Sequence, residues 1–106
     1  MTELNEIKRD GGKAQKNSGR GKIQKGDAKL GPFCYDIKEY ANSFSVSKDV
    51  WGKVCTDAFR SGRMVPALKL VLGAGDAKTR VWVIGDNMFH EMLEAWKEKY
   101  GESDED

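Results

Sequence analysis

The chain has 106 residues, of which 39% are hydrophobic and 33% charged, and its formal net charge is +1. A chain of this length holds one hydrophobic core, which excludes a multidomain enzyme. No apolar run approaches the ~20 residues of a membrane span, and the N-terminal residues lack the order of a signal peptide, so we expect a cytoplasmic protein without a membrane partner. Two cysteines and one histidine are too few for a four-ligand zinc site.

The near-zero net charge hides a strong asymmetry along the chain. Residues 8–25 carry seven basic side chains against one acid, Asp10, and are rich in glycine, which predicts a basic, flexible loop over residues 8–26. A solvated loop would explain this run, but a polyanionic partner explains it better. From Glu91 onward acids outnumber bases, and residues 101–106 are expected to form a disordered acidic tail.

The first half of the chain predicts a short helix and a β-hairpin. Residues 2–9 can form two turns of helix, which end at Gly11-Gly12. Residues 27–30 and 33–38 are predicted to pair as antiparallel strands around a turn at Gly31-Pro32, because the second segment is rich in aromatic and β-branched residues.

The second half predicts a helix, two strands and a final helix. Ser47 is a suitable N-cap for a helix that runs to about Ser61. Residues 65–72 form a nearly continuous apolar run, typical of a strand covered on both faces, and residues 81–84 are its expected neighbour. Residues 86–100 have apolar side chains at helical spacing.

The order helix, hairpin, helix, strand, strand, helix predicts an α/β domain over residues 1–100 with a central mixed β-sheet flanked by helices. The last helix carries a stripe of aromatic residues and methionines. Core packing is the preferred interpretation of this stripe, with an interface as the alternative. Its members are Met88, Phe89, Met92, Leu93 and Trp96.

Three residues of the hairpin could carry chemistry. Asp36 and Lys38 are two residues apart on one strand, so their side chains share a face, and the turn at Gly31-Pro32 can bring Asp27 to them. Converging carboxylates repel each other unless a cation lies between them, and Mg²⁺ suits carboxylate and water ligands. The ammonium of Lys38 could orient a water or stabilise charge on a phosphate.

These residues resemble a known nuclease signature. Gly26-Asp27 followed by Tyr35-Asp36-Ile37-Lys38 is similar to the motif of the PD-(D/E)XK nuclease superfamily, and within it to the small phage and archaeal Holliday-junction resolvases. Gly11-Gly12 and Asn17-Ser18-Gly19 resemble the glycine-rich segment that precedes the first catalytic acid. The sequence departs from the motif in two positions, with Gly26 where proline is usual and Asp36 where glutamate is commoner.

The resemblance implies a restriction-endonuclease-like core and a role for each matched residue. Asp27 and Asp36 would hold Mg²⁺, with Mn²⁺ as a substitute, and Lys38 would assist the attacking water. A glutamate of the first helix would complete the metal site; spacing favours Glu3, with Glu6 one turn away as the substitute. Ser18 would lie near the scissile phosphate.

The resemblance also implies a DNA substrate with a four-way junction and a homodimer that supplies two active sites. Five basic residues are expected to contact DNA phosphates without reading bases. They are Lys13, Lys16, Arg20, Lys22 and Lys25.

Three other functions remain open alternatives, two of them acting on nucleic acid. One is a nuclease of the same superfamily that cuts nicked, flapped or linear DNA. The other is a nucleic-acid-binding module without catalysis, and an interaction protein that uses its acidic tail is a third, weaker alternative. His90 is expected to face solvent, and the turn at Gly73-Ala74-Gly75-Asp76 lacks the ending of a phosphate loop, so no nucleotide cofactor is indicated.

Overall fold

The computed structural model describes residues 3–16 and 23–101, with side chains for residues 5–13 and 28–101. Its centre is one five-stranded sheet with the strand order β1-β2-β3-β4-β5. Neighbouring strands are antiparallel except β3 and β4, which are parallel. The strands are β1 (Lys13–Lys16), β2 (Ile23–Leu30), β3 (Phe33–Tyr40), β4 (Val65–Leu72) and β5 (Thr79–Ile84).

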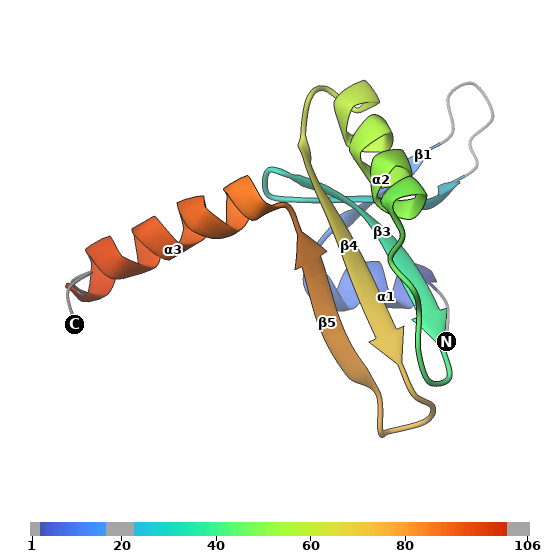
Figure 1. Cartoon of the computed structure of the whole chain (residues 1–106). Helices are drawn as coiled ribbons and strands as arrows, with labels where there is room; N and C mark the ends of the chain where they lie inside the picture. Colours follow the sequence, from blue (N-terminus) through green and yellow to red (C-terminus); the bar gives the residue numbers. More distant parts are fainter. Residues whose placement is uncertain (1–2, 17–22, 102–106) are drawn as a thin grey trace.

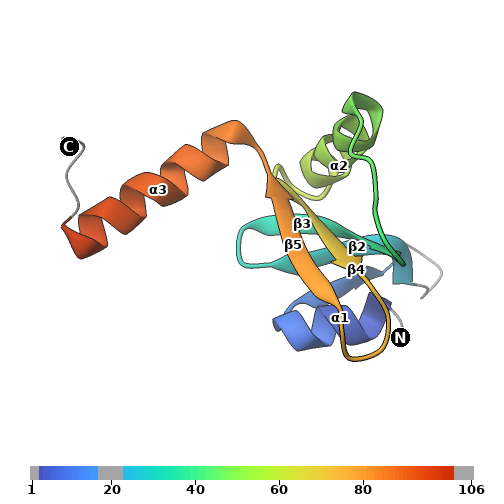
Figure 2. The same cartoon turned by 60° about the horizontal axis from the view of Figure 1, so that its bottom comes forward.

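Two helices cover opposite faces of this sheet. Helix α1 (Glu3–Asp10) lies under one face, and α2 (Lys48–Arg60) lies on the other (Figures 1 and 2). Parallel neighbours need a crossover connection, and α2 supplies it between β3 and β4. The predicted mixed α/β class with a central sheet flanked by helices is therefore confirmed. No helix in the described part of the chain is long and apolar enough to cross a membrane.

Several predicted boundaries are confirmed by the structure. The Ser47 hydroxyl caps α2 by accepting a hydrogen bond from the Val50 N–H at 3.1 Å, and Ser61 follows its last residue. Strand β4 spans the predicted apolar run, and the final helix, α3, spans Asp86–Tyr100. His90 faces solvent, as expected.

The predicted loop over residues 8–26 is wrong in part, because it contains regular structure. Helix α1 continues to Asp10, Lys13–Lys16 form β1, and β2 begins at Ile23, so the predicted hairpin strand is longer than residues 27–30. Gly11 has a φ of +80°, and a Cβ on Gly12 would lie 2.7 Å from the Lys29 carbonyl oxygen. This pair of glycines therefore turns the chain directly from α1 into an edge strand. Residues 17–22 and 102–106, with the predicted tail, lie outside the described residues.

The core has two halves, one on each face of the sheet. On the α1 face, Tyr35 and Ile37 of β3 pack with Ile7. On the α2 face, Leu68 and Leu70 of β4 pack with Val54. Residues 67–71 are all buried, which confirms that β4 is covered on both faces.

Helix α3 differs from the prediction that it packs in the core. It extends away from the sheet in both views (Figures 1 and 2), and none of its residues is buried. Strand β5 ends at Ile84, and α3 begins at Asp86. Gly85, the one residue between them, has an extended backbone that directs the helix outward. The apolar stripe of α3 is thus left on the surface.

Candidate active site

Asp36 and Lys38 form an ion pair on the face of β3 that is turned toward α2. The Nζ of Lys38 lies 3.3 Å from Oδ2 of Asp36, and the backbone N–H of Ile37 donates to Oδ1 at 3.0 Å. Tyr35 and Ile37, between which Asp36 lies, face the α1 side. The alternation of side chains along β3 therefore places the acid and the lysine together, as the sequence predicted.

The environment of Asp36 disfavours its charged form. Its side chain is only 13% exposed, and burial raises the pKa of its carboxyl above the ordinary value. Lys38 and the Ile37 N–H, with Lys53 of α2 further away, oppose this effect without cancelling it. A bound cation would offset the cost of burying this charged carboxylate, because the cation restores the stabilisation that burial removed.

Lys38 remains accessible from solvent. Its side chain is 32% exposed, and its Nζ lies 6.0 Å from the centre of the Phe44 ring. The ion pair with Asp36 holds one side of the ammonium group while the other can reach a solvent molecule or an oxyanion. This position suits a group that donates hydrogen bonds to a water or a phosphate oxygen.

Exposed lysines continue the same face toward the edge of the sheet. Lys13 of β1 lies directly opposite Lys29 of β2, and Lys29 lies opposite Cys34, two residues before Asp36. Both lysines are exposed, since α2 packs against β3 and β4. Like charges directly opposite each other destabilise a strand pair, so a phosphate-rich ligand would relieve their repulsion. Sequence reasoning identified Lys13 but missed Lys29, because the cross-strand register was not known.

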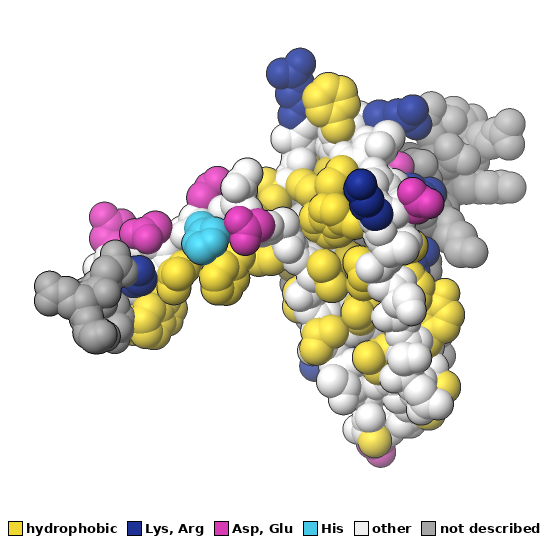
Figure 3. Space-filling view, viewed as in Figure 1, with side chains coloured by type: hydrophobic (Ala, Val, Ile, Leu, Met, Phe, Trp, Pro, Cys, Tyr) yellow, Lys and Arg dark blue, Asp and Glu magenta, His cyan; other side chains and the backbone are white. Residues whose placement is uncertain are grey.

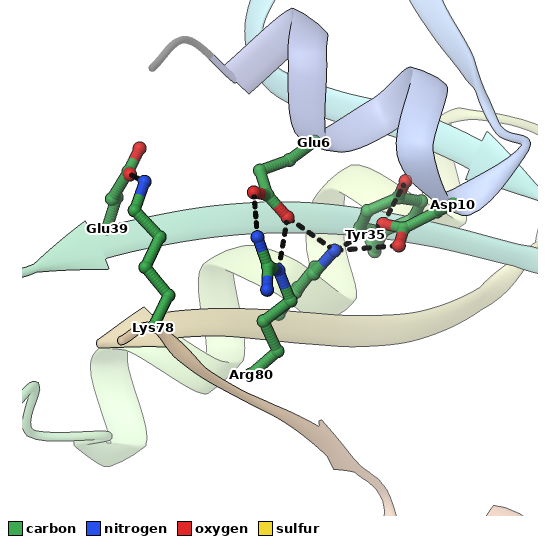
Figure 4. A network of polar contacts seen from close by, with 7 residues as sticks. Glu6, Asp10, Tyr35, Glu39, Lys78 and Arg80 are labelled. Carbon is green, nitrogen blue, oxygen red and sulfur yellow. Dashed lines mark hydrogen bonds and ion pairs between the residues drawn. The ribbon is translucent and has the colours of Figure 1, made fainter. Parts of the chain in front are cut away.

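Glu6 is not brought to Asp36 and Lys38. It lies on the α1 face, fully buried, where Arg80 donates to it in bidentate fashion through Nε at 3.1 Å and Nη2 at 3.0 Å (Figure 4). The Nζ of Lys69 lies 2.8 Å from its Oε1. The hydrogen bond from Arg80 is the main cause that lowers the pKa of Glu6 to about 2, and Lys69 adds to it. Glu6 is therefore a fully paired carboxylate.

Asp10 closes this buried ionic cluster. Both of its carboxylate oxygens lie 2.7 Å from Nζ of Lys69, and the Tyr35 hydroxyl donates to Oδ2 at 3.1 Å (Figure 4). Burial, with the Asp10 carboxylate next, raises the pKa of Tyr35. Two acids and two bases balance in charge, and each buried side-chain polar atom among the described residues has a hydrogen-bond partner. The cluster attaches α1 to β3, β4 and β5.

Sequence reasoning missed Lys69 and Arg80, although one signal was present. Lys69 is the only charged residue in the apolar run of β4, a strand predicted to be covered on both faces. A lysine in such a strand must meet a carboxylate, because an unpaired buried charge is prohibitively costly. The signal predicts that a partner exists, but only the fold shows that it comes from α1.

The remaining predicted site residues lie partly outside the described part of the chain. Asp27 is in β2, one residue before Ala28, which pairs with Tyr35; Asp36 is one residue beyond Tyr35. The side chain of Asp27 is outside the described residues, as are those of Glu3, Lys16 and Lys25. Ser18, Arg20 and Lys22 are outside them entirely. Among the side chains that are described, no three metal-ligating groups come together.

Comparison of the chain with protein-family models, with curated proteins and with solved structures gave no match. The candidate site therefore depends on the geometry of this chain and on the sequence motif alone.

Proposed function

We propose that the chain is a metal-dependent DNA endonuclease whose active site contains Asp36 and Lys38. The observation that carries the proposal is the ion pair between these residues, at 3.3 Å, on the sheet face that also exposes Lys13 and Lys29. A partly buried acid with a raised pKa, an accessible ammonium group and neighbouring exposed lysines support this proposal.

Mg²⁺ is the proposed cofactor, with Mn²⁺ as a substitute. Asp36 offers a partly buried carboxylate, a hard oxygen donor of the kind that Mg²⁺ prefers. Asp27 would be the second ligand, since it precedes the residue that pairs with Tyr35. When bound, Mg²⁺ would stabilise negative charge on the phosphate. Glu6 has no part in this proposal, because Arg80 and Lys69 already occupy its carboxylate.

Lys38 would hold the attacking water and the phosphate in the correct relative position. Its ammonium donates hydrogen bonds only, so it can fix a water through the water's oxygen and stabilise a phosphate oxygen that gains charge. The ion pair with Asp36 fixes the ammonium at the sheet surface. Such positioning removes part of the entropic barrier to an in-line attack.

Lys13 and Lys29 would bind the phosphate backbone. Their side chains lie on one face of the β1–β2 pair. Contacts to phosphates do not read the DNA bases, so binding would be independent of DNA sequence and sensitive to salt. Selectivity would then come from the shape of the DNA. A four-way junction is the proposed substrate, and a homodimer would cut its two symmetric strands.

A nucleic-acid-binding module without catalysis is the second candidate function. The opposed pair Lys13 and Lys29 favours it, because phosphate binding alone would use these lysines. Metal-dependent cleavage distinguishes the two functions.

The test is an end-labelled four-way junction incubated with the purified protein and Mg²⁺, beside a linear duplex of the same sequence and an EDTA control. Paired symmetric nicks in the junction alone are the expected result. Cleavage of both substrates would retain the nuclease and reject junction selectivity. A shifted band without cleavage in Mg²⁺ or Mn²⁺ would reject the nuclease and favour the binding module.

A further inference from the structure

Tyr40 and Phe44 form an aromatic stack beside the ion pair of the candidate site. Their ring centres lie 5.1 Å apart, and the ring planes are inclined by only 24°. Tyr40 is the last residue of β3, and Phe44 lies in the segment that leads from β3 to α2. Figure 3, viewed from the α2 side of the sheet, shows hydrophobic side chains on this face below α2, and Tyr40 is among the large exposed hydrophobic residues.

Strand β3 places an acid, an ammonium group and an aromatic ring in one row. Asp36, Lys38 and Tyr40 are each two residues apart, so alternation directs all three side chains to the face of β3 that is turned toward α2. A step of two residues along a strand covers about 6.6 Å. The Nζ of Lys38 lies 6.0 Å from the centre of the Phe44 ring, so the aromatic pair and the ammonium group are direct neighbours.

The two rings of the stack are held differently. Phe44 packs against the hydrophobic core on the α2 face. Tyr40 lies on Phe44 and remains 46% exposed. The backbone of Tyr40 is fixed, because the Gly73 N–H donates to its carbonyl oxygen at 3.0 Å. Phe44 therefore supports Tyr40 from the core side, and Tyr40 presents aromatic surface to solvent.

An exposed aromatic ring next to a cation suits a nucleobase and its phosphate. Bases of any identity stack on aromatic side chains, because every base has a π-face, and proteins that bind single-stranded DNA combine such rings with basic side chains. The separation of the Lys38 ammonium from the Phe44 ring is comparable to the distance between the phosphate and the base of one nucleotide. A base inside a continuous duplex is already stacked on its neighbours, so only an unpaired base can use this surface.

We propose that Tyr40, supported by Phe44, stacks an unpaired nucleobase of the DNA next to the phosphate that Lys38 holds. The inference rests on the proposed function for the role of Lys38, and it adds a preference for DNA with unpaired bases at the site of cleavage. A base that is mismatched or already single-stranded costs the least free energy to present. Branched or gapped DNA would therefore be preferred to a continuous duplex.

Helix α3 offers a matched control for this stack. Trp96 and Tyr100 form a second exposed aromatic pair, with ring centres 4.9 Å apart, and the Nζ of Lys99 lies 5.5 Å from the centre of the Tyr100 ring. This pair also combines rings with a lysine. It lies on the helix that extends away from the sheet, so it is separate from the candidate site (Figure 1).

The experiment measures binding of a short single-stranded oligonucleotide that contains 2-aminopurine, a base whose fluorescence falls when it stacks on an aromatic ring. Binding is measured in EDTA, beside a duplex of the same sequence, for wild type, Tyr40→Leu, Tyr40→Trp and Tyr100→Leu. Leucine keeps an apolar cover over Phe44 but removes the π-face, whereas tryptophan retains a π-face. Circular dichroism checks that each variant is folded.

Wild type should bind the single strand and quench the fluorescence of 2-aminopurine. Tyr40→Leu should lose the quenching and about 5-fold or more in affinity for the single strand, since stacking contributes at least this much for each base. Its affinity for the duplex should change little. Tyr40→Trp should keep both the affinity and the quenching, and Tyr100→Leu should match wild type.

Equal affinity and quenching in wild type and Tyr40→Leu would overturn the inference, as would a wild type that binds no single strand. The same loss in Tyr100→Leu, or an equal loss for single strand and duplex in Tyr40→Leu, would also overturn it, because the proposed stacking is confined to Tyr40 and to unpaired bases. Cleavage is not the readout in EDTA. A protein that cleaves no junction in Mg²⁺ would therefore reject the nuclease, while the binding result decides the stacking.

Discussion

Nζ of Lys69 lies 2.7 Å from both carboxylate oxygens of Asp10, a residue 59 positions earlier in the chain. This contact joins helix α1 to strand β4 of the sheet. The carboxylates of the two candidate clusters lie on opposite faces of the sheet. Glu6 and Asp10 pair with Lys69 and Arg80 on the α1 face, whereas Asp36 pairs with Lys38 and accepts a hydrogen bond from the Ile37 N–H on the α2 face. We expect the first group to stabilise the fold, and Asp36 is the carboxylate that the proposed function uses.

Replacement of Lys69 should destabilise the fold strongly. Lys69→Met keeps the side-chain volume but leaves Asp10 buried without its base, so we expect the free energy of unfolding to fall by about 3 kcal/mol. Lys78→Met is the control, because Lys78 pairs with the more exposed Glu39, and we expect a loss of about 1 kcal/mol or less. Urea denaturation measures both. Equal losses would contradict a special role for the buried cluster.

Acid should weaken the fold through Glu6. Its pKa is about 2 in the folded protein against an ordinary value of 4.5, so the charged form contributes stability that is fully present above pH 4.5 and is lost as the pH falls toward 2. Glu6→Gln, which cannot titrate, should lose less stability over this window than wild type does. Urea denaturation at several pH values between 5 and 2 gives the slopes, and parallel slopes for the two proteins would refute the assignment.

Replacement of Asp36 should stabilise the protein in the absence of a metal. Burial raises the pKa of Asp36, so its charged form costs stability once the pH is above that raised pKa, and the cost is absent below the ordinary pKa. Asp36→Asn should therefore raise Tm at pH 7 in EDTA and have no such effect at acid pH. Asp76→Asn, at an exposed turn position, is the control. A lower Tm for Asp36→Asn at pH 7 would mean that the carboxylate is structural.

Lys13 and Lys29 should determine the salt dependence of DNA binding. Each phosphate contact contributes about 1 to the slope of log K against log salt concentration, so Lys13→Gln and Lys29→Gln should each reduce the slope by about 1. Lys48→Gln, exposed at the start of α2, is the control and should change the slope less. Fluorescence anisotropy with a labelled junction gives the slopes. Unchanged slopes in both sheet variants would remove this face from the DNA-binding surface.

Much of the fold was accessible from the sequence because its signals are local. Ser47 predicted the start of α2, and the apolar run predicted β4 residue for residue. The pairing of Asp36 with Lys38 followed from alternation along one strand, a property that needs no knowledge of the rest of the fold.

Long-range features could not be predicted in the same way. β1 was missed because Lys13–Lys16 has no apolar alternation, and its strand conformation comes from pairing with β2. The partners of Glu6 come from β4 and β5, and a local pattern cannot show that α1 crosses under those strands. The stripe of α3 predicts burial, but periodicity alone does not tell whether the covering surface belongs to the same chain.

The most direct test of the account is single-turnover cleavage of a four-way junction by wild type, Asp36→Asn and Lys38→Ala, with binding of the same junction measured in parallel. We predict that each variant loses at least about 100-fold in cleavage rate in Mg²⁺ while it binds the junction nearly as tightly as wild type. Asp76→Asn and Lys48→Ala, at exposed positions, should cleave normally. Wild-type cleavage rates in Asp36→Asn or Lys38→Ala would contradict the assignment of the active site.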